Sequence, residues 1–131
     1  REDSFSDGTL RLLGILWSLQ EGTGLLLLEE PELSLNSAVV EQIPNLIHQI
    51  MRGRKQKRQV IITTHSEHLL KNQGIDAENI IILKPDHEGT KIQSVSESDR
   101  VALSAGLSVA DVILPQTRPD HIDQLGLWLD V

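Results

Sequence analysis

One short stretch, residues 24–32, constrains the fold of this chain more than any other; it reads G-L-L-L-L-E-E-P-E. A continuous apolar run of this length, entered through glycine and left at a proline, predicts a central β-strand buried on both faces. The core must end at Glu29 and Glu30, because ionised carboxylates are not buried without a cation or hydrogen-bond donors. Side chains alternate along a strand, so the two carboxylates are expected to point to different sides. One could then hold a metal while its neighbour orients a water; the alternative is a buried strand that simply meets an acidic loop.

Length and composition bound the class of protein. The chain has 131 residues, enough for one compact domain. It has no cysteine, which excludes disulfides and cysteine-ligated zinc or iron–sulfur sites. A net charge of -7 argues against a nucleic-acid binder that is basic as a whole. No apolar run could span a bilayer and no signal-peptide pattern is present, so we expect a cytoplasmic protein without membrane contact. The chain begins at Arg1 rather than methionine, and we expect a fragment of something longer.

The first predicted element is a helix from Thr9 to Gln20, whose apolar residues are dense enough for burial on most sides. Ser6 and Asp7 precede it and are candidate N-caps, because their oxygens can accept the free amide hydrogens of the first turn. The same amides would bind a phosphate if no side chain occupied them, and Gly8 would let that phosphate approach closely. The residues alone leave both interpretations open.

A second helix is predicted over residues 37–51, from an apolar stripe of helical period. Proline disrupts a helix interior, so we expect a kink or restart near Gln42 to Pro44. Residues 52–58, R-G-R-K-Q-K-R, hold five of the twelve basic residues of the chain. We expect a solvated loop there, with a nucleic-acid contact as the alternative.

A second buried strand is predicted at residues 60–64, V-I-I-T-T, which are rich in β-branched side chains. A strand–helix–strand crossover makes the two strands parallel, and their carboxyl ends then share the edge at which open α/β sheets bind ligands. Glu29, Glu30 and His65 are therefore expected to converge. A lone histidine at a strand end can also be a structural hydrogen-bonding residue.

The rest of the chain predicts smaller elements. They are a short helix at residues 66–71, strands at 79–83 and 91–95 joined by a turn at 85–89, and short helices at 96–105 and 108–114. His87 lies between two acidic residues and could belong to a metal cluster, but we favour a solvated hairpin tip. The tail, residues 115–131, has a late apolar patch that we expect to dock on this domain or on a missing part: Leu125, Leu127, Trp128 and Leu129.

Three motifs, in order and at sensible spacing, resemble those of ABC-type ATPases. Residues 5–13, F-S-D-G-T-L-R-L-L, resemble the signature motif in the form found in RecF-like, SMC-like and OLD-like proteins. Residues 25–32 resemble the Walker B motif and the start of the D-loop, and residues 60–66 resemble the strand that ends in the switch histidine, T-T-H-S. The resemblance covers residues 4–83 well and the remainder loosely. Each motif alone is weak, whereas the ordered triple is specific.

The resemblance implies roles for three residues at the strand ends. Glu29 takes the place of the Walker B acidic residue that holds Mg²⁺, where most of the superfamily has aspartate. Glu30 would be the general base that polarises the attacking water. His65 would contact the γ-phosphate of ATP and help to fix that water. Phosphoryl transfer needs such positioning and charge neutralisation more than covalent chemistry.

The resemblance also implies contacts with a second head. Ser6, Asp7 and Gly8 form the start of the signature helix, which would reach the γ-phosphate of ATP held by the opposite protomer. Residues 33–36 match the D-loop that crosses the dimer interface, with Asn36 where transporters generally carry aspartate.

One part of such an ATPase is missing, because no G-x-x-x-x-G-K-[ST] loop occurs in the sequence. We therefore interpret residues 1–131 as one domain, the C-terminal lobe of an ABC-type ATPase, completed by an N-terminal Walker A lobe in the same or another chain. The expected fold is α/β: a P-loop NTPase-like parallel sheet with flanking helices. Residues 4–83 form its motif-bearing core, and residues 84–131 form a hairpin and helical tail.

The leading hypothesis is half of an ATP-hydrolysing head that dimerises with ATP and serves DNA repair, chromosome maintenance or anti-phage defence. Its cofactors would be ATP and Mg²⁺, and its partners a second head and possibly DNA. The alternative is a non-catalytic regulatory module that lends only its signature face to a partner ATPase. A third hypothesis is an OLD-type ATPase that works with a nuclease partner outside this chain. A transporter ATPase fits less well, because the D-loop lacks the usual S-A-L-D.

Overall fold

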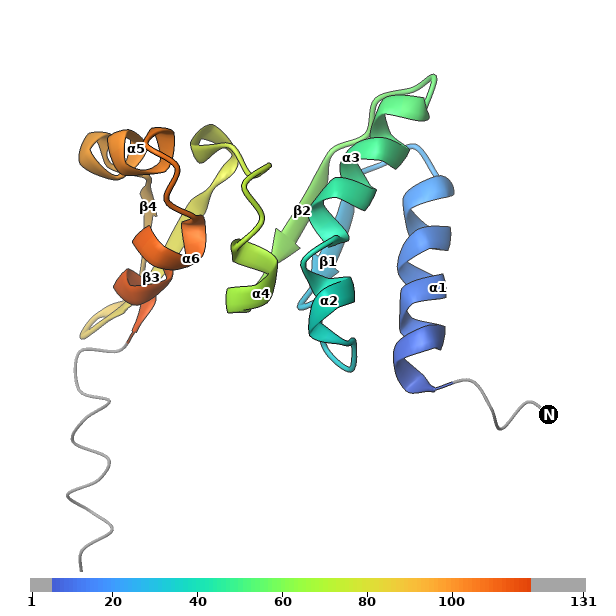
Figure 1. Ribbon diagram of the computed structural model, residues 1–131, viewed down its shortest axis with the longest axis horizontal. Coiled ribbons are helices and arrows are strands. Elements are labelled where there is room, and N and C mark those ends of the chain that lie inside the picture. The colour runs from blue at the N-terminus through green and yellow to red at the C-terminus, as the bar shows by residue number, and fades with distance from the viewer. Residues whose placement is uncertain (1–5, 119–131) are drawn as a thin grey trace, which may run out of the picture. The chain divides into compact units, whose positions relative to one another are not determined.

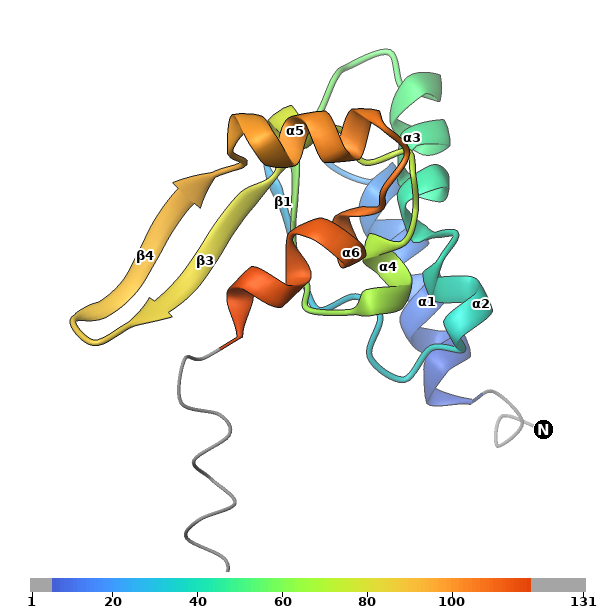
Figure 2. The ribbon, with the colours of Figure 1, turned by 60° about the vertical axis from the view of Figure 1, so that its left-hand side comes forward.

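The computed structural model describes residues 6–118, which fall into two compact units divided after Gly74 (Figure 1). The first unit combines a parallel sheet with helices, and the second combines an antiparallel hairpin with short helices (Figure 2). The predicted α/β class is therefore confirmed. The division into a core and a tail within one domain stays a prediction, and the apolar patch predicted near the C-terminus lies outside the described residues.

The first unit holds two strands and four helices. In chain order they are α1 (Asp7–Gln20), β1 (Leu26–Glu29), α2 (Ser37–Val40), α3 (Ile43–Gly53), β2 (Val60–Thr63) and α4 (Glu67–Leu70). The expected interruption of the second helix is confirmed: α2 ends at Val40, and Pro44 lies in the first turn of α3, where its missing N–H is not needed. The core of this unit is aliphatic and consists of Ile15, Leu19, Val40, Ile43 and Leu69.

Strands β1 and β2 are parallel, as predicted, with Leu27 opposite Ile61 and Glu29 opposite Thr63. Burial alternates along both strands, so one face of the sheet is half-buried and the other is exposed. Leu27 is 66% exposed and Ile61 is 44% exposed. The prediction that the leucine strand is buried on both faces is therefore wrong for this structure. The alternation has a plain cause: the described residues cover one face of the sheet only.

Helix α1 departs from its prediction for the same reason. Its buried residues, Ile15 and Leu19, lie on one side. Leu10, Leu13 and Trp17 follow one another at helical spacing and are exposed, Trp17 by 69%. The expectation of burial on most sides is wrong, and a second apolar surface is left uncovered in this unit.

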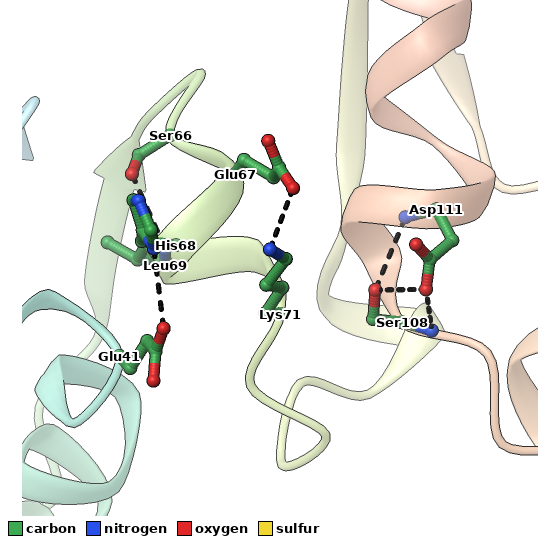
Figure 3. Close-up of polar contacts among 8 residues, drawn as sticks. All are labelled: Glu41, Ser66, Glu67, His68, Leu69, Lys71, Ser108 and Asp111. Atoms are coloured by element: carbon green, nitrogen blue, oxygen red, sulfur yellow. Dashed lines mark hydrogen bonds and ion pairs between the residues drawn. The ribbon is translucent and has the colours of Figure 1, made fainter. Parts of the chain in front are cut away.

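The second unit consists of a hairpin and short helices. They are η2 (Ala77–Asn79), β3 (Ile81–Asp86), β4 (Gly89–Ser94), α5 (Glu97–Ser104), α6 (Val109–Val112) and η3 (Leu114–Thr117). Strands β3 and β4 are antiparallel, with Leu83 opposite Ile92. Helix α6 begins with a capping box in which the Ser108 and Asp111 side chains each accept a backbone N–H of the other residue (Figure 3). The core of this unit is Ile82, Val95, Val109, Ala110 and Ile113.

The predicted hairpin is present, but its turn is tighter than expected. Strand β3 continues through Pro85 to Asp86, so only His87 and Glu88 form the tip instead of residues 85–89. Gly89 takes a φ of 129°, a conformation that favours glycine. None of the helices within residues 6–118 is both long and apolar enough to cross a membrane.

Candidate site at the carboxyl ends of the parallel strands

The carboxyl ends of β1 and β2 meet at one edge of the sheet, as their parallel direction requires. The ladder continues one residue past β1, because the Glu30 amide donates to the Thr63 carbonyl over 2.9 Å. Glu30 then takes a φ of 41°, and Ser34 takes a φ of 65°. Positive φ is uncommon for residues with a side chain and marks a tightly constrained turn. The loop after β1 therefore turns sharply at the first residue beyond the strand.

Glu30 and His65 are brought together by this turn. His65 Nδ1 lies 2.6 Å from Glu30 Oε1, although 35 positions separate the residues in the chain. The His65 side chain is 75% exposed and that of Glu30 is 31% exposed. The predicted convergence of these two residues is present, and the pair is open to a ligand from solvent.

Among the described residues, no ion pair or side-chain hydrogen bond joins Glu29 to this pair, although convergence of all three residues was predicted. Glu29 is the last residue of β1 and belongs to the exposed face of the sheet, opposite Thr63. Its carboxylate is therefore accessible to a cation. Mg²⁺ suits such a residue, since it usually takes one or two protein carboxylates and completes its shell with water and substrate phosphates. Among residues 6–118 no group of three or more histidine, aspartate or glutamate side chains gathers as a metal site, which also leaves His87 without one.

A second pair of side chains joins the same two loops. Thr64 Oγ1 donates to Glu32 Oε1 over 2.5 Å, and the Ser66 amide donates to Thr64 Oγ1 over 3.0 Å. The other carboxylate oxygen, Glu32 Oε2, is buried and accepts no hydrogen bond from a described residue. Glu32 and Thr64 lie within the Walker B and switch-histidine motifs, but the sequence predicted no role for either; their place in those motifs was the only signal.

Arg11 is the other residue that the sequence analysis missed. From α1, its guanidinium donates to the Glu30 carbonyl over 2.9 Å and more weakly to the carbonyls of Glu29 and Pro31, each at 3.4 Å. One fork thus holds three successive carbonyls at the end of β1. Arginine suits this position because its donors are fixed in a plane.

The signature segment packs on the loop after β1. Ser6 caps α1, since its Oγ accepts the Thr9 amide over 3.2 Å, while Asp7 is the exposed first residue of the helix. A Cβ added to Gly8 would lie 2.3 Å from the Ser34 carbonyl oxygen, so this position accepts only glycine without a shift. The cap interpretation of Ser6 is confirmed, and Gly8 has a packing reason that needs no phosphate.

Asn36 also has a structural role. Its Oδ1 accepts the Ala38 amide over 2.9 Å and caps α2. After β2, Ser66 caps α4 through the Leu69 amide, and His68 on that helix lies 3.3 Å from Glu41 (Figure 3). The described residues of this unit therefore include two glutamate–histidine pairs, and of these two the pair of Glu30 and His65 stands at the strand ends.

The basic segment, residues 52–58, does not form the wholly solvated loop that was expected. Arg54 donates to the carbonyls of Leu19 (2.8 Å), Gln20 (2.5 Å) and Gly22. Arg58 donates to those of Ser18 (2.5 Å), Glu21 and Gly24 (2.6 Å). Two arginines thus bind the free carbonyls where α1 ends and the chain enters β1. Arg52, Lys55 and Lys57 remain exposed.

Shifted pKa values occur in the second unit. The hydrogen bond from Lys91 lowers the pKa of Asp86, the last residue of β3, and the hydrogen bond from the His87 amide lowers it further. Hydrogen bonds from Gln116 and then Ser96 lower the pKa of Asp99 in the first turn of α5. Both aspartates are stabilised in their ionised form.

Comparison with known proteins shows which folds and families this chain is similar to. Among solved structures, the chain is similar to one from a study of ATP-driven dimerization and DNA-stimulated activation of SMC ATPases, with a TM-score of 0.55 and 20% sequence identity. The match covers 79% of this chain and 62% of that one, so this chain spans less than two thirds of its length. At this identity the likeness shows a shared fold. No curated protein matches.

A family profile gives the stronger result. The profile described as "AAA domain, putative AbiEii toxin, Type IV TA system" matches residues 2–71, more than half of the chain and the part that carries the paired strands. Family and fold agree with the resemblance to an ABC-type ATPase head and with a general role as an ATPase domain. The chain belongs to this AAA domain family.

Proposed function

We propose that the chain is the C-terminal half of an ATP-hydrolysing head of the ABC type. The contact of Glu30 with His65 at the ends of two parallel strands carries the proposal. A carboxylate and an imidazole in hydrogen-bond reach can together hold a water and accept its proton. Glu30 acts as the general base toward the attacking water, and His65 fixes that water and contacts the γ-phosphate of ATP.

The remaining residues of the motifs complete the assignment. Glu29 would hold Mg²⁺, which when bound offsets the negative charge of the phosphates. Ser6, Asp7 and Gly8 present the N-terminus of α1, a 14-residue helix whose amides not taken by the Ser6 cap would attract a phosphate of the opposite head. Asn36 stands in the loop that would face that head. These contacts would link hydrolysis to ATP-driven dimerisation and to a DNA-related process such as repair, chromosome maintenance or anti-phage defence.

Two uncovered apolar surfaces support completion by a Walker A lobe. Leu27 and Ile61 are exposed on the sheet, and Leu13 and Trp17 are exposed on α1. Contiguous apolar surface of this kind marks an interaction site. A lobe that covered the bare face of the sheet would also bring a phosphate-binding loop to the strands that carry Glu30 and His65.

The test is ATP hydrolysis by this chain mixed with the lobe that carries the Walker A loop, beside the chain alone. We expect activity only in the mixture, and a loss of about 100-fold or more with Glu30→Gln, because the general base is removed. The matched control is Glu41→Gln, which alters the other glutamate–histidine pair and should leave the rate unchanged. Equal rates for Glu30→Gln and the unaltered chain would contradict the assignment.

A second candidate is a non-catalytic module that lends its signature face to a partner ATPase. It is favoured by the caps, since Ser6 and Asn36 already bond to backbone amides of their own helices. The same mixture separates the two candidates. A folded, nucleotide-bound complex without hydrolysis would support the module. DNA or a nuclease as a further partner is tested by adding each to the mixture and measuring the ATPase rate.

A further inference from the structure

The loops that follow β1 and β2 are joined by two side-chain contacts. The first joins Glu30 to His65, and the second joins Glu32 to Thr64. The proposed function uses the first contact only. The second contact lies beside it, one residue before His65 on one loop and two residues after Glu30 on the other.

The direction of the hydrogen bonds at Thr64 follows from the chemistry of its neighbours. The Thr64 hydroxyl gives its hydrogen to the carboxylate oxygen Glu32 Oε1. Its lone pairs are then free for the Ser66 amide, which lies 3.0 Å away. Glu32 therefore sets the orientation of a hydroxyl that in turn holds the backbone on the far side of His65.

Apart from its contact with Glu30, little in its surroundings fixes the position of the His65 side chain. Its side chain is 75% exposed, so packing does not select its rotamer. The residues on each side of it, Thr64 and Ser66, are half-buried and bonded to each other. The position of the imidazole thus depends on the backbone turn around it, and the Glu32 carboxylate stabilises that turn through Thr64.

Glu32 is half-buried, and the burial of one of its carboxylate oxygens argues for a specific role. A buried oxygen without a donor carries an uncompensated loss of solvation, and Glu32 Oε2 is such an atom among the described residues. A neutral acceptor could bond to Thr64 without this loss. A carboxylate gives a shorter and stronger bond, and the 2.5 Å between Glu32 and Thr64 lies in the range of charge-assisted bonds.

We propose that Glu32 is a positioning residue that acts through Thr64 to hold His65 against Glu30. The proposal rests on the proposed function, because it assigns to Glu32 the alignment of the pair that carries hydrolysis. It predicts that loss of the brace lowers the rate of the chemical step and leaves ATP binding, which depends on the Walker A lobe, unchanged.

The test uses Thr64→Val, which keeps the shape of the side chain and removes its hydroxyl, and Thr64→Ser, which restores the hydroxyl. Glu32→Ala removes the carboxylate that accepts the Thr64 hydroxyl. Thr90→Val, at an exposed position of β4, is the control. We expect Thr64→Val and Glu32→Ala to lower kcat of the completed ATPase by about 10- to 100-fold with KM within about twofold, since misplacement alone has effects of this size. Thr64→Ser should recover most of kcat, and the double variant should be no slower than the slower single variant.

A second readout needs no activity. In the full chain, amide hydrogen exchange at Ser66 should quicken at least about tenfold in Thr64→Val, since its acceptor is gone. Wild-type kcat and wild-type exchange in Thr64→Val would overturn the proposal, and so would a lowered kcat that Thr64→Ser does not restore. Retained hydrolysis in Glu30→Gln would instead refute the proposed function, and the exchange measurement would still decide whether the brace exists.

Discussion

Arginine holds both ends of the β1–β2 sheet, but the two ends use its charge differently. At the amino end, Arg54 and Arg58 bind the free carbonyls at the end of α1, and no acidic side chain of residues 6–118 takes part. At the carboxyl end, Arg11 binds the main-chain carbonyls of the residues whose side chains are the candidate acids. The arginines at the amino end therefore have a purely structural role. At the carboxyl end, the guanidinium of Arg11 orients the loop, and the Glu30 carboxylate remains in contact with His65.

The largest expected effect is at the amino end. The double variant Arg54→Ala, Arg58→Ala leaves the carbonyls at the end of α1 without donors and should lower the free energy of unfolding by about 3–4 kcal/mol, since bonds to a charged donor contribute about 1.5–3 kcal/mol each and these are partly solvated. The measurement is urea unfolding of the full chain. Lys55→Ala with Lys57→Ala removes two exposed charges of the same segment and is expected to change stability by less than about 0.5 kcal/mol. Equal losses of unfolding free energy in the arginine and lysine double variants would contradict a specific role for the two arginines.

The next effect separates two glycines of α1. Gly8→Ala brings a Cβ against the Ser34 carbonyl oxygen and should destabilise the unit by about 1–3 kcal/mol, because backbone must shift. Gly14→Ala meets nothing within 4 Å and should stabilise the helix by about 0.5–1 kcal/mol. Thermal unfolding of both variants measures the difference. A stabilising Gly8→Ala would show that the loop after β1 is not packed tightly on α1.

A smaller effect is expected from Arg11→Ala. Only one of its three carbonyl contacts is short, so a loss of about 1–2 kcal/mol is expected. Arg52→Ala, at an exposed position of α3, is the control and should be near neutral. Urea unfolding gives the stability. A loss as large as that of the Arg54 and Arg58 double variant would mean that the two ends are closed in the same way.

The sequence was sufficient for the parts of the fold that local patterns determine. The apolar runs located both strands, and their crossover predicted a parallel pair whose ends bring Glu30 to His65. The proline rule located the break between α2 and α3. These features depend on residues close in the chain or on the handedness of a single crossover, so they can be predicted from the sequence.

What the sequence could not give depends on contacts between distant residues. A basic run looks the same whether it is solvated or turned inward, and only the structure shows that Arg58 reaches back 40 positions to Ser18. Glu32 and Thr64 likewise join two loops that are 32 positions apart. The exposure of one face of β1 was not predicted for another reason. A leucine run indicates that both faces of a strand are suited to apolar packing, but the described residues pack on one face only.

The smallest expected effect tests whether a charged side chain stabilises the second unit, as the charged arginines stabilise the first. Arginine–carbonyl bonds do not titrate between pH 3 and pH 7, so the loss in the Arg54 and Arg58 variant should be independent of pH in that interval. The pKa of Asp99 is lowered by the hydrogen bond from Gln116, and a lowered pKa in the folded state contributes stability above the unfolded value of about 4. That contribution is lost as pH falls through the folded pKa. Asp99→Asn should therefore be less stable than the unaltered chain at pH 7, and the difference should shrink as pH falls below the unfolded pKa of about 4, as measured by urea unfolding over that range. A deficit that persists at low pH would show that the shape of Asp99 and not its charge holds Gln116, and the second unit would then differ from the first, where charged arginines close the helix.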